Sequence, residues 1–176
     1  MSVILGIDPG SRICGYGLIN SLGNKLEFIA CGCIRIDTSL SFPERLQVIH
    51  AGMSEIIQKY APQEAAIEEV FLGKNAGSAL KLGQARGAAI VACTNQSLPV
   101  AEYAARKVKL ALTGSGAANK GQMQHMITSL LSLSATPQED AADALCIAVC
   151  HAHTQSSLIK MAGVKSSRRG RLLGIK

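Results

Sequence analysis

Several signals are missing from this chain. None of its apolar runs approaches the roughly 20 residues that a membrane-spanning helix requires. No basic stretch precedes an apolar one at its start, so we expect no signal peptide and a cytoplasmic location. Its six cysteines form no CxxC pair, and His151 and His153 do not complete a zinc spacing. We therefore expect buried free thiols and no zinc site.

Disorder is also disfavoured, because 48% of the residues are hydrophobic and the mean hydropathy is +0.22. A length of 176 residues suits a single compact domain, and we find no internal repeat. We expect the domain to span residues 1–155. The remaining residues, 156–176, are expected to form a basic, flexible tail.

The basic charge is unevenly placed along the chain. The formal net charge is +6, and residues 160–176 alone contain six basic residues and no acidic one. Residues 73–120 contain seven basic residues against a single acid, Glu102. This distribution predicts a basic surface beside an acidic centre. Such an arrangement suits a protein that binds a polyanion on the basic surface and processes it at the acidic centre.

Apolar periodicity and turn residues predict ten elements. The strands are expected at residues 2–8, 15–20, 25–36, 65–70 and 99–103. The helices are expected at residues 42–60, 78–96, 104–112, 120–133 and 138–153. Short turns favour antiparallel pairing of the first three strands. The order as a whole predicts an α/β fold, with a five-stranded mixed sheet flanked by helices on both faces.

Four carboxylates stand at the edges of predicted core elements. Asp8 and Glu68 end apolar strands, whereas Asp140 and Asp143 lie one turn apart at the start of the last helix. The helix dipole favours negative charge at that position, which is a sufficient structural explanation for the helical pair. It does not explain the strand pair. If the first and fourth strands are neighbours, all four carboxylates meet at one edge of the sheet.

Such a cluster would repel itself unless cations bind to it. Hard oxygen ligands without Cys or His favour Mg²⁺ or Mn²⁺. A pair of these ions about 4 Å apart commonly serves phosphodiester hydrolysis, one activating water and the other stabilising the leaving oxygen. The spacing alone is compatible with a metal-dependent nuclease and leaves the structural explanation open.

The motifs around these acids resemble the RuvC family of Holliday junction resolvases over about residues 3 to 153. The resemblance is carried by Gly6-Ile7-Asp8-Pro9-Gly10-Ser11, Ala66-Ile67-Glu68-Glu69-Val70-Phe71, Ala79-Leu80-Lys81-Leu82-Gly83-Gln84-Ala85-Arg86-Gly87 and Asp140-Ala141-Ala142-Asp143-Ala144-Leu145. It implies a ribonuclease H-like fold and a homodimer that makes paired, Mg²⁺-dependent nicks in four-way junction DNA during recombination and repair. It also implies two Mg²⁺ ions per subunit, replaceable by Mn²⁺, and work alongside the RuvA–RuvB branch-migration complex.

The resemblance also implies roles for single residues. It assigns catalysis and metal binding to Asp8, Glu68, Asp140 and Asp143. Lys109 and Lys120 match residues that hold the DNA backbone near the cut, and Phe71 matches an aromatic that stacks on an opened base, although core packing is the simpler role for a phenylalanine. Four more residues are expected to contact DNA: Lys81, Arg86, Ser11 and Arg12.

Other interpretations fit parts of the sequence. Actin-like and Hsp70-like ATPases share the first strand and turn, but they need a second matching domain for which 176 residues leave no room. A non-catalytic junction-binding protein would need the basic surface but not four converging acids. A ribonuclease H-like nuclease with a different nucleic-acid substrate is the main alternative. The helix at residues 78–96 is our candidate for the dimer interface, with internal packing as its simpler role.

Overall fold

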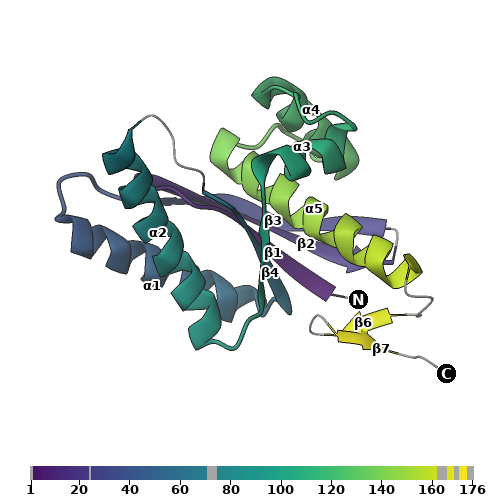
Figure 1. Cartoon of the computed structure of the whole chain (residues 1–176), viewed down its shortest axis with the longest axis horizontal. Coiled ribbons are helices and arrows are strands. Elements are labelled where there is room, and N and C mark those ends of the chain that lie inside the picture. The colour runs from purple at the N-terminus through teal and green to yellow at the C-terminus, as the bar shows by residue number, and fades with distance from the viewer. Residues whose placement is uncertain (1, 24, 71–74, 162–165, 169–170, 174–176) are drawn as a thin grey trace.

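The computed structural model describes residues 2–23, 25–70, 75–161, 166–168 and 171–173. Its main sheet has the strand order β3-β2-β1-β4-β5 (Figure 1). The five strands are β1 (Ser2–Asp8), β2 (Ile13–Leu22), β3 (Lys25–Arg35), β4 (Glu64–Glu68) and β5 (Val100–Tyr103). The first three pair antiparallel, and β1, β4 and β5 run parallel. The predicted mixed sheet, with the first and fourth strands as neighbours, is confirmed.

Helices cover both faces of this sheet, as predicted. In the described part of the chain they are α1 (Phe42–Tyr60), α2 (Ala76–Asn95), α3 (Ala105–Thr113), α4 (Lys120–Leu130) and α5 (Glu139–Met161). Figure 1 shows α1 and α2 on one side of the sheet and α3, α4 and α5 on the other. Because side chains alternate along a strand, Leu5 and Ile7 pack in the core under α1 and α2, while Ile4 and Ala66 pack in the core under α5. Among the residues that the structure describes, no helix has the length and apolarity to cross a membrane.

Local signals account for the ends of α1, which match the predicted range. Pro43 lies in the first turn, where backbone N–H groups have no acceptor within the helix, so the missing N–H of proline costs no hydrogen bond. The carboxylate of Glu44 accepts a hydrogen bond from the backbone N–H of Ser41 at 2.8 Å. At the other end Ala61 takes a left-handed conformation with φ 45°, and Pro62 prevents continuation.

The last helix is longer than predicted. It continues to Met161 instead of ending at His153, because no glycine or proline interrupts the sequence before Gly163. The predicted helix end was therefore wrong, and α5 extends into residues 156–161, which were expected to belong to the basic tail. Two short strands, β6 (Ser166–Arg168) and β7 (Arg171–Leu173), pair antiparallel farther along.

Helix α5 lies directly against the backbones of β1 and β2. A Cβ atom added to Gly6 would stand 2.0 Å from the carbonyl oxygen of Ala144, and one added to Gly15 would stand 2.0 Å from that of Asp140. Only glycine permits this approach without displacing the helix. The contact at Gly15 brings the start of α5, with Asp140 and Asp143, to the end of the sheet where β1 stops.

Candidate active site

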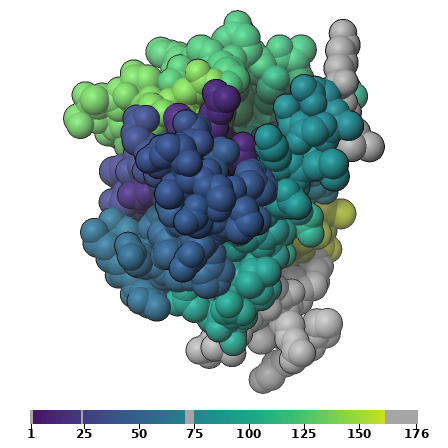
Figure 2. All heavy atoms as spheres, turned by 90° about the vertical axis from the view of Figure 1, so that its left-hand side faces the viewer, coloured from purple at the N-terminus to yellow at the C-terminus, as the bar shows by residue number. Residues whose placement is uncertain are grey.

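Three elements deliver the four predicted carboxylates to one end of the molecule. Asp8 is the last residue of β1 and Glu68 the last of β4, and these strands are parallel neighbours with Ile7 paired to Ile67. Asp140 and Asp143 come from the first turns of α5. All four are partly buried. Figure 2 faces this end, where light-green atoms from the region around the start of α5 lie beside purple atoms of the first strands.

Three of these acids share an open cleft of about 300 Å³ with two basic residues. Asp8, Glu68 and Asp143 line it together with Lys109 of α3 and Lys120 at the start of α4. Asp140 is not among the lining residues. Its carboxylate instead accepts a hydrogen bond from the side-chain amide of Gln138 at 2.8 Å. The structure thus brings five of the predicted site residues together and places Asp140 beside them.

Electrostatic coupling shows that the acids form one cluster. Burial, followed by the negative charges of Asp143, Glu68 and Asp140, raises the pKa of Asp8 to about 8, against a smaller opposing effect of Lys120. The pKa values of Glu68 and Asp143 are also raised, in each case mainly by burial. Ionising all of these groups together is therefore unfavourable, and a bound cation would remove the penalty.

The donor set suits a hard divalent ion. Every candidate ligand is a carboxylate oxygen, the type that Mg²⁺ and Mn²⁺ prefer. As the side chains stand, no three His, Cys, Asp or Glu residues within the described ranges are close enough to share one ion. The residues fit the metal by their chemistry and three of them line one cleft, but their carboxylates have to draw together to bind it.

The basic residues of the cleft differ in their surroundings. Lys120 forms an ion pair with Glu139, which is the main cause of its raised pKa. Lys109 is half-buried at the cleft wall, and Lys81 is exposed on α2. Phe71 lies outside the described residues, so its stacking role stays a prediction.

Arg86 is engaged within the protein. Its Nε donates a hydrogen bond to the backbone oxygen of Glu68 at 2.8 Å, and its guanidinium pairs with Glu102. Only 17% of its side chain is exposed. The structure therefore gives Arg86 a contact to the end of β4, a role that the sequence did not suggest, beside the DNA contact predicted for it.

The loop after Asp8 has a second support that sequence reasoning missed. The guanidinium of Arg45 donates to the backbone oxygen of Ser11, and its Cζ lies 5.5 Å from the ring centroid of Phe42. The backbone N–H of Ile36 donates to the carbonyl of Arg12 at 2.9 Å, while the Arg12 side chain is exposed. Arg45 is 34 positions from Ser11, so no local pattern could have revealed the contact.

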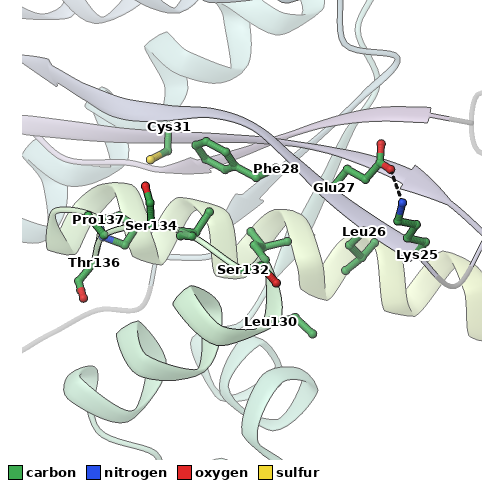
Figure 3. Close-up of a pocket in the computed structure, with 13 residues that line it drawn as sticks. Lys25, Leu26, Glu27, Phe28, Cys31, Leu130, Ser132, Ser134, Thr136 and Pro137 are labelled. Atoms are coloured by element: carbon green, nitrogen blue, oxygen red, sulfur yellow. Dashed lines mark ion pairs between the residues drawn. The ribbon is translucent and has the colours of Figure 1, made fainter.

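A larger hollow lies elsewhere. A space of about 620 Å³ separates β3 from Leu130, the last residue of α4, and from residues 131–137, which lead to α5. Figure 3 shows Phe28 and Cys31 of β3 facing Ser134 and Pro137 across it. It contains none of the predicted site residues, so size alone does not identify the active site.

The sequence of the chain matches one family of known proteins over nearly its whole length. Residues 4–151 match the family model for crossover junction endodeoxyribonuclease RuvC. Proteins of that name from Saccharophagus degradans and Photobacterium profundum are 59% and 60% identical to this chain. The alignments cover 98% and 97% of this chain and 100% and 99% of the relatives.

Solved structures agree with this match. The T. thermophilus RuvC in complex with Holliday junction substrate superposes with a TM-score of 0.84 at 33% identity, covering 89% of this chain and 96% of that one. The yeast mitochondrial Holliday junction resolvase Ydc2, at 12% identity and a TM-score of 0.66, covers 90% of this chain and 80% of that one, and shares the fold alone. The predicted ribonuclease H-like fold is confirmed. Sequence match over nearly the whole length and a matching fold lead to one conclusion: the chain belongs to the RuvC family of crossover junction endodeoxyribonucleases.

Proposed function

We propose that this protein resolves four-way DNA junctions by paired, symmetric nicks that depend on Mg²⁺. The observation that carries the proposal is the cleft in which Asp8, Glu68 and Asp143 meet Lys109 and Lys120. A cleft with carboxylates for metal ions and lysines for phosphate suits cleavage of a nucleic-acid backbone. The T. thermophilus relative, solved with a Holliday junction substrate, supports the choice of DNA.

Each group in the cleft has a distinct task. Asp8, Glu68, Asp143 and the adjoining Asp140 would hold two Mg²⁺ ions, which Mn²⁺ can replace. When bound, such a pair supplies an activated water and stabilises the leaving oxygen. Lys109 and Lys120 attract and orient the phosphate, and Lys120 exchanges its pairing with Glu139 for one with the DNA. Arg86 keeps the end of β4, and with it Glu68, in place.

A two-fold symmetric junction requires two active sites, so we propose a homodimer formed through α2. Leu80, Gly83, Gly87 and Val91 follow helical spacing along one side of α2. Leu80 and Val91 are 67% and 48% exposed, and a Cβ added to either glycine meets no atom of the described chain within 4 Å. A second backbone can therefore approach this face. On family membership alone, we extend the proposal to cooperation with the RuvA–RuvB branch-migration complex.

The substrate proposal is tested with a synthetic four-way junction, a plain duplex and an RNA–DNA hybrid. We expect wild-type protein to nick the junction symmetrically in Mg²⁺ and to bind it uncut in Ca²⁺. Asp8→Asn should reduce cutting by more than about 100-fold, because it removes a metal ligand, yet leave junction binding intact. Asp37→Asn, the same change at an exposed turn, is the control. Equal cutting of plain duplex, or preference for the hybrid, would contradict the proposal.

A second prediction concerns stability against pH in EDTA. The pKa of Asp8 is higher in the folded protein than its ordinary 3.8, so this group makes the folded state less stable as pH rises from about 4 to about 8. Asp8→Asn should therefore be more stable to urea than the wild type, and the difference in unfolding free energy should grow over that interval. Asp37, whose pKa is lowered by hydrogen bonds from Ser39, should show no such gain when changed to Asn. If the unfolding free energies of the wild type and Asp8→Asn changed with pH in parallel, the raised pKa of Asp8 would be refuted.

The dimer proposal is tested by Val91→Glu. A carboxylate buried at a two-fold interface would face its own copy, so the dimer dissociation constant measured by sedimentation equilibrium should rise at least about tenfold. The two strands of one junction should then be nicked independently of each other. Leu158→Glu on α5, whose parent residue is 49% exposed compared with 48% for Val91, is the matched control. An unchanged dimer in the Val91 variant would exclude α2 as the interface.

A further inference from the structure

A buried polar chain crosses the core beneath α5, away from the acidic cleft. Nε2 of His151 lies 2.6 Å from a carboxylate oxygen of Glu64, and its Nδ1 lies 2.8 Å from the hydroxyl of Tyr103. His151 is 2% exposed and Glu64 is 7% exposed. Both ring nitrogens therefore have partners, which fixes the orientation of the imidazole. Helix α5 contributes the histidine, while β4 and β5 contribute the acid and the tyrosine.

Burying such a pair is not an efficient way to stabilise a core. Well-packed apolar residues of similar volume are often as stabilising as a buried ion pair, or more so. A directional polar contact does, however, add a fixed geometry. The pair is therefore better suited to positioning α5 against β4 than to stabilising the core.

The positions of His151 on α5 and of Glu64 on β4 indicate which residues the contact aligns. His151 lies eight residues after Asp143 on α5, a rise of about 12 Å at about 1.5 Å per residue. Glu64 lies four residues before Glu68 on the same face of β4, a distance of about 13 Å at about 3.3 Å per residue. Because the two distances match, joining His151 to Glu64 places Asp143 level with Glu68. The cleft shared by Asp143 and Glu68 agrees with this alignment.

Much of the α5 contact with β1 and β2 is made by small residues. Gly6 faces Ala144 and Ala148, and Gly15 faces the backbone of Asp140, whereas Leu145 packs its side chain against Gly17. The larger buried residues of α5, Leu145, Ile147 and Val149, pack apolar surface, which is not directional. The hydrogen-bonded contact between His151 and Glu64 adds a directional constraint on the axial position of the helix.

We propose that Glu64 and His151 are positioning residues whose contact sets the axial register of α5 on β4 and so aligns Asp143 with Glu68 for metal binding. Tyr103 completes the arrangement by fixing the imidazole ring. This inference rests on the proposed metal-dependent function. It adds two residues that touch neither metal nor DNA.

The test replaces the pair by apolar residues of similar size, Glu64→Met with His151→Leu, in the full chain. Binding of Mn²⁺ is measured from the electron paramagnetic resonance of the free ion, and thermal unfolding is followed in parallel. We expect a melting temperature at or above that of the wild type, together with a Mn²⁺ dissociation constant raised about tenfold. His153→Leu, two residues along the same helix and exposed, is the control and should change neither quantity.

Each outcome decides the matter. If the folded apolar pair binds Mn²⁺ as the wild type does, the contact has a structural role only and the inference is overturned. If the wild type itself fails to bind Mn²⁺, the proposed metal centre fails, and the inference fails with it. Should the apolar pair not fold, Glu64→Gln and Glu64→Ala decide instead. Gln keeps an acceptor for His151 and should retain Mn²⁺ affinity, whereas Ala should lose it, and equal affinities would refute the proposal.

Discussion

The close contact between the α5 backbone and the glycines of β1 and β2 is the constraint on which the site depends. With Gly15 against the carbonyl of Asp140 and Gly6 against that of Ala144, the first turns of α5 reach the end of β1. Asp140 and Asp143 thereby come close enough to Asp8 to raise its pKa. A larger residue at either glycine would push the helix outward and separate the carboxylates. The close packing at Gly6 and Gly15 therefore also determines how strongly the carboxylates at this edge repel one another.

The two ends of the α5–β4 contact are opposite in character. At one end Glu68 and Asp143 lie near each other as like charges, a situation that disfavours the folded state unless a cation is present. At the other end Glu64 and His151 are joined, and the contact with His151 lowers the pKa of Glu64. A site that repels itself needs its elements held by something other than its own side chains. The core of small residues, Arg86 at the end of β4 and the buried polar chain together provide that support.

Much of the fold could be predicted from the sequence because its signals are local. The range of β1 follows from a β-branched run ending at Asp8, and that of α1 from Pro43 and Pro62. Asp8 and Glu68 could be singled out as candidate ligands because acids at strand ends are chemically conspicuous, and the pairing of β1 with β4 brings them to one edge of the sheet. The contacts of Arg45 with Ser11 and of Arg86 with Glu102 could not, since they join residues far apart in the chain. The end of α5 was misjudged because a change in composition after His153 resembled a stop, although no helix-breaking residue follows until Gly163.

The central claim is that carboxylates from β1, β4 and α5 form one metal-dependent cutting centre. The most direct measurement is a crystal structure of the wild-type protein soaked with Mn²⁺, with the ions located by their anomalous scattering. The account predicts Mn²⁺ in the cleft, with Asp8, Glu68 and Asp143 among its ligands and Asp140 turned toward it. Fully loaded crystals whose Mn²⁺ sites lie away from this cleft, with the four carboxylates unmoved, would contradict it.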